Sequence, residues 1–322
     1  MNEQQEYIPG LQDEQIVKIQ KYEMFSQEAN QVREKDKRLI RELFKSFSNS
    51  YLMVGIGFQR AYGSILSGDY FDLLRLPENK FLFVFSDISG HGLPAYTTLI
   101  RLRSAVILAV KDAEAEYAVT GIVDYSAIIK NISEKFTDIM DMSSSNDFAS
   151  ANFVFIEEGD KCIKLRFFNR SMLFPIIVRR EPEGARIINL NSRHADWKPD
   201  KGYLLGSDIK SLISENAYSN TPECCFDIYQ GDMILFYTDG ITEAFDCRSD
   251  NSQYGEKRLE QKLLEMCDLP PQFVINSIFH SVYDFIGSHE YQKDDMTAVL
   301  IDLPPLECKN IRIKVQYRIS RE

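Results

Sequence analysis

The stretch KFLFVFSDISGHGLPAY, residues 80–96, brings together an apolar run, a single acid and a glycine-rich turn. Its first part, Phe81–Phe85, has the pattern of a short buried strand. The run closes on Asp87, and Gly90-His91-Gly92 then lets the backbone turn sharply. Pro94 stands where the first turn of a helix is predicted, a position that tolerates proline. A buried strand that ends in a turn explains the glycines alone, whereas a loop that handles phosphate or metal explains the glycines and the acid together.

The composition and net charge of the chain argue against several classes of binding partner. The chain has 322 residues, of which 44% are hydrophobic, enough for a large core. Acids outnumber Lys plus Arg by 48 to 37, and the formal net charge of −11 disfavours nucleic acid and anionic membrane. The six cysteines form no CxxC pair, and the sequence starts without the pattern of a signal peptide. No uninterrupted apolar run approaches the roughly 20 residues of a membrane span, so we expect a cytoplasmic protein with reduced thiols and no membrane insertion.

The first 48 residues are predicted to form a separate helical segment. Residues 11–47 are polar, contain neither Gly nor Pro, and carry apolar residues at spacings of four and three. These residues are Phe25, Ala29, Val32, Leu39, Leu43 and Phe47, and Asp36 interrupts the series. A single helix of this length extends about 50 Å at about 1.5 Å per residue. We expect it to form a homodimer or to transmit a signal; the alternative is two shorter helices packed on the body.

The rest of the chain consists of blocks of strands and blocks of helices. Strands are predicted at 51–59, 71–76, 80–87, 151–158, 162–168, 175–180, 186–190, 232–239 and 296–303, and helices from Pro94 onward and at 125–141, 256–266 and 271–287. The helix after Pro94 carries an apolar stripe formed by Leu99, Ile100, Val106, Val110 and Ala113. Such blocks favour mostly antiparallel sheets with helices on their outer faces. The weakly patterned stretch 191–230 is interpreted as loops and a small insertion, and 310–319 as an edge strand.

Four turns carry an acid next to a strand. They are Ser67-Gly68-Asp69, Ser86-Asp87, Tyr237-Thr238-Asp239-Gly240 and Lys293-Asp294-Asp295. Taken singly, each aspartate is interpreted as a turn residue or a helix cap. Carboxylates gathered at one edge of a sheet repel one another unless a cation lies among them. Hard ions such as Mg²⁺ and Mn²⁺ prefer oxygen ligands, whereas neither an HExxH motif nor a cysteine cluster is present to indicate zinc.

Five segments, in order, carry a resemblance to a known family. They are SGDYFDLLRL, FSDISGHGLPAY, GDMILFYTDGITEAFD, YGEKRLEQKLLE and KDDMTAVLIDL. Together they closely resemble the bacterial SpoIIE-like branch of the PPM (protein phosphatase 2C type) serine/threonine phosphatases, over roughly residues 50–305. The resemblance implies an α+β fold, a four-layer α-β-β-α sandwich of two antiparallel sheets with flanking helices. We therefore expect three regions: a long N-terminal helix in 1–48, a phosphatase domain in 49–305 and a C-terminal strand extension in 306–322.

The resemblance also implies a binuclear Mn²⁺ or Mg²⁺ centre and its ligands. Asp69 stands at the aspartate of the family's G-G-D motif, and Asp87 at the acid of D-x-x-G-H-G, where it would bridge both ions. Ile88 follows where the family uses a backbone carbonyl. Asp239 matches the acid of T-D-G and Asp294 the first acid of D-D-x-T, with Asp295 as the alternative at that last position. His91 is a candidate general acid, and the alternative, which we favour, is a loop histidine that fixes the glycine turn.

Two departures from the family pattern stand out. Ser67 replaces the first glycine of G-G-D, which leaves the ligand in place. Where many relatives have N-A-G-H before a strand, this chain has Asn169-Arg170-Ser171-Met172, a change that concerns the substrate groove or a regulatory surface. Arg170 is a candidate partner of the phosphate, but we favour an exposed arginine near a turn.

Three functions compete. The first is a metal-dependent phosphoserine/phosphothreonine protein phosphatase in which water activated by two ions attacks phosphorus. By resemblance, its substrate is a phosphorylated bacterial regulator in signal transduction, such as an anti-sigma-factor antagonist. The second is a catalytically silent scaffold that dimerises through the N-terminal helix, although such a protein has no reason to keep mutually repelling carboxylates. The third is a two-metal phosphodiesterase that acts on a small nucleotide.

Overall fold

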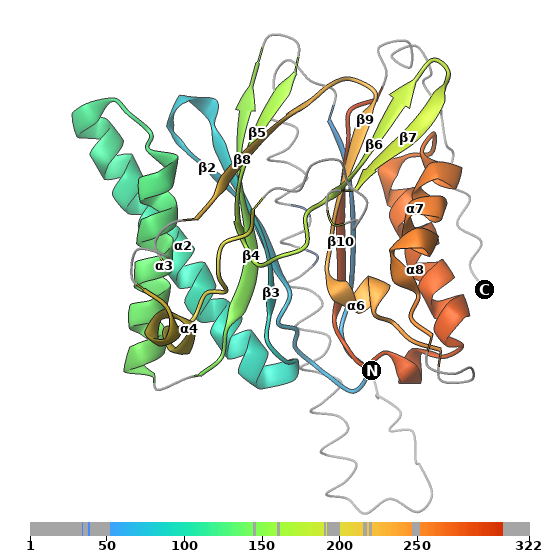
Figure 1. The fold of residues 1–322 in the computed structure, drawn as a ribbon, viewed down its shortest axis with the longest axis horizontal. Coiled ribbons are helices and arrows are strands. Elements are labelled where there is room, and N and C mark those ends of the chain that lie inside the picture. Colours follow the sequence, from blue (N-terminus) through green and yellow to red (C-terminus); the bar gives the residue numbers. More distant parts are fainter. Residues whose placement is uncertain are drawn as a thin grey trace, which may run out of the picture.

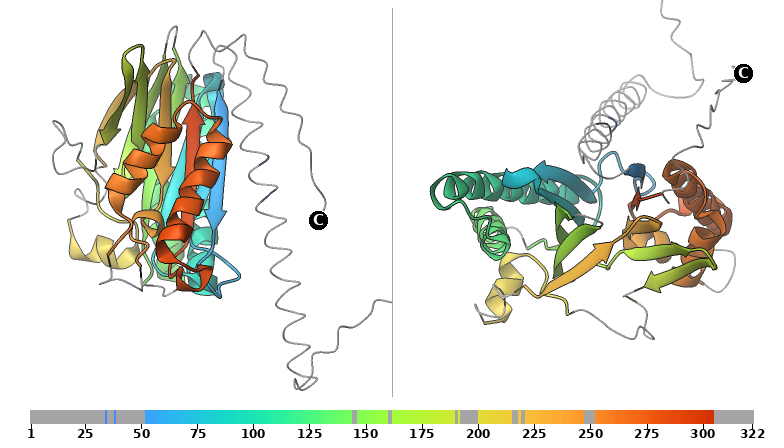
Figure 2. Two further views of the ribbon diagram at one scale, coloured as in Figure 1. Left: turned by 90° about the vertical axis from the view of Figure 1, so that its right-hand side faces the viewer. Right: turned by 90° about the horizontal axis from the view of Figure 1, so that it is seen from above.

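The computed structural model describes residues 52–143, 146–159, 162–189, 191, 200–214, 218, 221–246 and 252–304, together with Glu34 and Arg38. These residues form two five-stranded antiparallel sheets that pack face to face, with helices on both outer sides (Figure 1). Seen from above in Figure 2, the two sheets lie between a pair of helices on either side. The α+β four-layer fold implied by the resemblance is therefore confirmed.

One sheet, called sheet B, follows the strand order β2-β3-β4-β5-β8. Its strands are β2 (Tyr70–Arg75), β3 (Phe81–Ile88), β4 (Ala149–Glu158), β5 (Ile163–Arg170) and β8 (Glu223–Ile228). The predicted hairpins β2–β3 and β4–β5 are both present as antiparallel pairs. A short 3₁₀ turn, η1 (Pro77–Asn79), joins β2 to β3.

The second sheet, called sheet A, follows the order β1-β10-β9-β6-β7. Its strands are β1 (Met53–Gln59), β6 (Ile176–Glu181), β7 (Gly184–Asn189), β9 (Asp232–Tyr237) and β10 (Met296–Asp302). The first and last strands of the described chain thus pair with each other along their full length, from Met53 with Asp302 to Gln59 with Met296. The chain passes from sheet A to sheet B directly after β1, through residues 60–69.

Each sheet is covered by two long helices (Figure 1). Helices α2 (Gly92–Thr120) and α3 (Tyr125–Met142) pack on sheet B, and α7 (Gly255–Met266) and α8 (Pro271–Ile286) pack on sheet A. Shorter helical segments are α4 (Ser207–Leu212), α6 (Asp239–Thr242) and η2 (His289–Tyr291). Helix α2 is long and apolar enough to cross a membrane by length and composition. In the fold, however, its Leu99, Leu102 and Val106 are buried against sheet B.

The run Phe81–Phe85 is buried on both faces, which is why it is continuous rather than alternating. Its odd-numbered phenylalanines enter the core between the sheets, whereas Leu82 and Val84 face α2 and α3. Phe83 meets Phe236 of β9 edge to face, with ring centroids 4.9 Å apart, so the two sheets contact each other through aromatic rings.

Several boundaries differ from the sequence prediction. The stretch 191–230 is not only loop: it supplies α4 and the edge strand β8, which pairs with β5. The strand residues do alternate, with Cys224 and Ile228 buried and Cys225 exposed, but the run has only six residues and is preceded by no apolar stretch. Helix α2 begins at Gly92, before Pro94. Ile100 was predicted to lie on the buried stripe of that helix but is 41% exposed.

The predicted helix within residues 1–48 and the predicted strand at 310–319 lie outside the described residues. The division of the chain into 1–48, 49–305 and 306–322 stays a prediction.

Candidate active site

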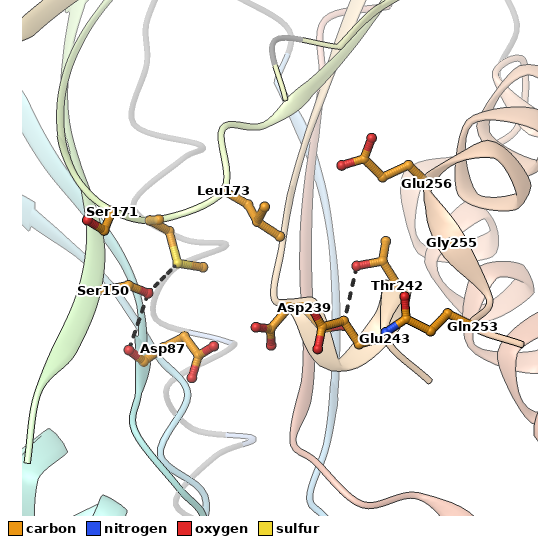
Figure 3. A pocket seen from close by; sticks show the side chains of 11 residues that line it. Asp87, Ser150, Ser171, Leu173, Asp239, Thr242, Glu243, Gln253, Gly255 and Glu256 are labelled. Carbon is orange, nitrogen blue, oxygen red and sulfur yellow. Dashed lines mark hydrogen bonds between the residues drawn. The ribbon is translucent and has the colours of Figure 1, made fainter. Parts of the chain in front are cut away.

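A cavity of about 310 Å³ opens at one end of the sandwich, between the two sheets. It is lined by Asp87, Ser150, Ser171, Met172, Leu173, Asp239, Thr242, Glu243, Gln253, Gly255 and Glu256. In Figure 3, Asp87 at the end of β3 and Asp239 at the start of α6 point toward one another from opposite walls. One acid therefore comes from each sheet.

Asp87 lies close enough to the other predicted acids for their charges to change the pKa of its carboxyl. Burial, followed by the charges of Asp69, Asp239 and Asp294 and a hydrogen bond with Asp239, together raise the pKa of Asp87 to about 10. These causes mean that the four acids, which are up to 225 positions apart in the sequence (69 to 294), converge on one site. Of the predicted set, Asp87 and Asp239 line the cavity, and Asp69 and Asp294 lie near enough for their charges to act on Asp87.

The carboxylate of Asp69 is hydrogen-bonded by two threonines that belong to, or directly follow, strands of sheet A. It is only 2% exposed, and its Oδ2 accepts hydrogen bonds from Thr297 Oγ1 at 2.6 Å and Thr238 Oγ1 at 3.1 Å. Its own backbone N–H donates to Ser67 Oγ at 3.0 Å. Burial, and then the charge of Asp295, raises the pKa of Asp69 well above its ordinary value, although the two threonine hydroxyls act in the opposite direction.

The carboxylates of the adjacent residues Asp294 and Asp295 have different hydrogen-bond partners. Asp295 is 3% exposed, and its two oxygens accept hydrogen bonds from the backbone N–H groups of Ala61 and Gly68. Asp294 is exposed as a residue, but its carboxyl is partly buried, and Oδ1 accepts from the backbone N–H of Asp295 at 2.8 Å. Burial of its carboxyl raises the pKa of Asp294, the Asp295 amide lowers it, and the charge of Asp239 raises it again. Of the two acids, Asp294 is the one presented toward Asp239.

Two glycines of the motifs are required by close packing. A Cβ on Gly240 would lie 2.0 Å from the carbonyl oxygen of Asp295. A Cβ on Gly68 would lie 2.9 Å from Cβ of Ala95 and 3.2 Å from the carbonyl oxygen of Ile88. Gly68 therefore lets the loop before Asp69 approach the end of β3, where the backbone carbonyl of Ile88 was predicted as a ligand.

His91 lies at the start of α2 rather than in the lining of the cavity. It is the residue before the first helical residue, between Gly90 with φ +79° and Gly92 with φ +75°. Its Nδ1 is 3.1 Å from Ser64 Oγ, and its charge is near enough to lower the pKa of Asp294. The geometry is that of a histidine that ties the glycine turn to the 60–69 loop.

Arg170 was predicted to be exposed, and this is wrong. Its side chain is fully buried, with Nη1 donating to the carbonyl of Tyr218 at 2.6 Å and Nη2 to Ser133 Oγ at 2.7 Å. Burial lowers its pKa to about 10. Arg170 therefore joins the end of β5 to α3 and does not face the cavity. A position at the end of a strand looks like a turn in the sequence, but here Ser133 of α3 and Tyr218 cover the arginine.

The neighbours of Arg170 shape the cavity wall. Ser171 has φ +54°, a conformation that favours glycine. Met172 follows and is 3% exposed, with its Sδ 2.9 Å from Ser150 Oγ. Met172 and Leu173 are the apolar side chains of the cavity lining.

Sequence reasoning missed several residues of the site. Thr238 and Thr297 belong to the T-D-G and D-D-x-T motifs, so their hydroxyls were visible as donors for a buried acid. Glu243 and Glu256 also line the cavity, and burial and the charge of Asp239 raise the pKa of Glu243. No local pattern separates these two glutamates from the surface acids of α7.

The donor set fits hard divalent cations. The converging side chains are all carboxylates, which Mg²⁺ and Mn²⁺ prefer and which repel one another without a cation. As the side chains lie, no three His, Cys, Asp or Glu residues in the described part of the chain are grouped as ligands of a single ion. Two of the acids, Asp87 and Asp239, instead share a hydrogen bond. The residue types and their convergence support a cation site at this edge of the sandwich.

Comparisons with known proteins agree with the fold and the motifs. The family model described as Stage II sporulation protein E (SpoIIE) matches residues 77–304, which is more than half of the chain. The SiaA-PP2C domain of Pseudomonas aeruginosa is 15% identical, with 89% of this chain and 98% of that chain covered and a TM-score of 0.62. No curated protein matches the sequence.

Two further solved structures share the fold. The PP2C phosphatase domain of SpoIIE from Bacillus subtilis, solved with a fragment of its regulatory domain, is 16% identical, with coverage of 79% and 64% and a TM-score of 0.56. The RsbU and RsbW domains of a Mycobacterium tuberculosis protein are 17% identical, with coverage of 79% and 61% and a TM-score of 0.55. The chain spans less than two thirds of the length of these two proteins.

Proposed function

Because this chain belongs to the SpoIIE-like branch of the PPM (protein phosphatase 2C type) serine/threonine phosphatases, we propose that it hydrolyses phosphoserine and phosphothreonine in proteins with the help of two divalent metal ions. The observation that carries the proposal is the convergence of Asp69, Asp87, Asp239 and Asp294 at one end of the sandwich. Buried carboxylates that raise one another's pKa destabilise a fold, so their presence together favours a site that binds cations.

Four aspartates and one carbonyl would hold the ions. We assign Asp87 as the bridge because it faces Asp239 across the cavity and interacts with each of the other three. Asp69, Asp239 and Asp294 would complete the set with the carbonyl of Ile88. The ions, when bound, lower the pKa of water and offset the negative charge of a phosphate. Either Mn²⁺ or Mg²⁺ suits these ligands.

The protein's own side chains would orient the reaction. Thr238 and Thr297 fix the carboxylate plane of Asp69. Met172 and Leu173 line the cavity and would offer a bound substrate an apolar contact. Each described cysteine lies outside this cavity lining, which agrees with attack by water rather than by a thiolate.

The proposal is tested by metal-dependent turnover. We expect Mn²⁺-stimulated hydrolysis of p-nitrophenyl phosphate, with loss of at least about 10³-fold in kcat in Asp87→Asn and Asp239→Asn, since these changes remove ligands of both ions. Asp268→Asn, an exposed acid after α7, is the control and should keep full activity. A wild-type protein that binds no Mn²⁺ by calorimetry and stays inactive would rule out the phosphatase and favour the scaffold.

The natural substrate is proposed to be a phosphorylated signalling regulator, such as an anti-sigma-factor antagonist, in the cytoplasm. Family membership and the negative net charge support a protein substrate over nucleic acid. A panel containing a phosphoserine protein, a phosphothreonine peptide and cyclic nucleotides separates this proposal from the two-metal phosphodiesterase. Light scattering of the full chain and of a chain that starts at residue 49 tests the proposed dimer through the N-terminal segment.

A further inference from the structure

The 60–69 loop, defined as residues 60–69 between β1 and β2, decides where Asp69 lies. It leaves sheet A, crosses to sheet B and contains neither helix nor strand. A segment without its own regular hydrogen bonds takes its conformation from its partners elsewhere in the chain. Two side chains from the segment before β10 supply many of these partners.

The first is Asp295. Its Oδ1 accepts from the backbone N–H of Ala61 at 2.8 Å, and its Oδ2 accepts from that of Gly68 at 2.9 Å. The two amides lie near opposite ends of the loop, so one buried carboxylate closes the loop on itself. A carboxylate whose two oxygens both accept backbone amides forms strong, charge-assisted hydrogen bonds.

The second is Gln292, which is 7% exposed. Its Nε2 lies 3.2 Å from the carbonyl of Gln59 and 2.8 Å from that of Arg60, and its backbone carbonyl accepts from the N–H of Tyr62. The same Nε2 also lies 3.0 Å from the carbonyl of Asp294. Gln292 thus links the start of the loop to the residue before Asp295.

The orientation of Gln292 is itself fixed. Its Oε1 accepts from the hydroxyl of Tyr283 at 2.8 Å, a residue of α8. The amide can therefore not rotate without giving up this bond, and its N–H groups stay directed at the loop carbonyls. The link reaches from α8 through Gln292 to the 60–69 loop.

We propose that Asp295 and Gln292 are positioning residues that place Asp69 against Asp87 and Asp294 before any ion binds. The inference rests on the proposed function, because it assigns to Asp69 and Asp294 the role of metal ligands. In this proposal Asp295 is not itself a metal ligand, because both of its carboxylate oxygens accept hydrogen bonds from the 60–69 loop. Outer partners of this kind typically change metal affinity about 10- to 100-fold when mutated.

The first measurement uses the metal-free protein. In Asp295→Asn one acceptor oxygen becomes an NH₂ group that faces a backbone N–H, and in Gln292→Glu the donors to the loop carbonyls are lost while Asp295 stays intact. We expect peptides within residues 60–69 to exchange amide hydrogen at least about tenfold faster in both variants, whereas peptides within α3 stay unchanged. Exchange at the wild-type rate in both variants would overturn the proposal.

The second measurement is a calorimetric titration with Mn²⁺, followed by turnover at saturating Mn²⁺. Both variants should bind Mn²⁺ about 10- to 100-fold more weakly and recover kcat to within about threefold when Mn²⁺ saturates. If Asp295→Asn loses kcat that saturating Mn²⁺ does not restore while loop exchange stays at the wild-type rate, Asp295 is a ligand and the proposal is wrong. If Asp295→Asn does not fold, Gln292→Glu carries the same comparison.

The matched control is Asp232→Asn. Asp232 is a buried carboxylate, 2% exposed, that also accepts a backbone N–H, from Tyr229, and pairs with Arg179 at the end of β9 away from the cavity. It should change neither loop exchange nor Mn²⁺ affinity. If the wild type binds Mn²⁺ but hydrolyses no phosphate ester, the proposed function fails while exchange and affinity still decide the positioning role.

Discussion

Gly240 is a residue at which a single methyl group would disturb two predicted ligands. The carbonyl of Asp295 occupies the place that a Cβ would take, and Cβ of Asp294 is 3.5 Å away from it. The glycine follows Asp239 directly, so an added side chain would move Asp239 and Asp294 apart.

We therefore expect Gly240→Ala to lower the free energy of unfolding by more than about 2 kcal/mol, a typical cost of overpacking, and to weaken Mn²⁺ binding. Urea unfolding and calorimetry measure the two effects. Gly63→Ala is the control: Gly63 has φ +78° but nothing within 4 Å of its Cβ position, so it should cost only about 1 kcal/mol of backbone strain. Equal effects of both changes would contradict the packing explanation.

His91 can be tested through the leaving group. p-Nitrophenolate departs without a proton, whereas the oxygen of serine needs one, and a general acid contributes about 10²–10⁴-fold only in the second case. Since His91 contacts Ser64 and does not line the cavity, we expect His91→Ala to lower turnover of both substrates by the same factor, below about tenfold. A selective loss of at least about 100-fold on a phosphoserine peptide would instead make His91 the acid.

Among the elements, β10 connects the site to an ion pair at the opposite end of the sandwich. Asp294 and Asp295 precede its first residue, and Asp302 at its end pairs with Arg180 of β6. Arg180 also donates to the carbonyls of Gly231 and Cys267. The strand is therefore fixed at both ends by buried polar contacts.

Burial raises the pKa of Asp302 to about 6, although Arg180 acts to lower it. The folded state thus holds this proton at pH values where the unfolded state, with a pKa of 3.8, has lost it. The contribution of Asp302 to stability is largest below about pH 4 and falls as pH rises through about 6, by about 3 kcal/mol in total. We expect the difference in unfolding free energy between wild type and Asp302→Asn to decrease over this range in urea titrations. A difference that does not vary with pH would contradict this assignment.

At the scale of the whole molecule, the sandwich places one acid from the end of β3 in sheet B opposite another from the end of β9 in sheet A (Figure 3). An ion that binds between them links the two sheets and binds only the folded state. We expect Mn²⁺ at 100 times its dissociation constant to raise the free energy of unfolding by about 2.7 kcal/mol, measured by thermal or urea unfolding. Asp87→Asn should abolish the rise, and a rise that persists in this variant would place the ion elsewhere.

The strand Phe81–Phe85 and the turns that follow each motif could be read from the sequence alone, and the same motifs nominated the four acids as candidate ligands. Apolar periodicity, glycine and proline are local signals, so they report local structure reliably. The order of the motifs along the chain was enough to indicate the family and, through it, the layered fold.

Which side chains are covered, and by which distant segments, became visible in the three-dimensional fold. Arg170 has the sequence context of a turn residue but is buried by α3 and Tyr218, and β8 is a run of only six residues that becomes a strand by pairing with β5. Asp294 and Asp295 are adjacent and chemically identical, yet the amides of Ala61 and Gly68, more than 220 positions away (234 and 227), turn one of them from the cavity. The partners of a buried group come from distant segments, and no local pattern records them.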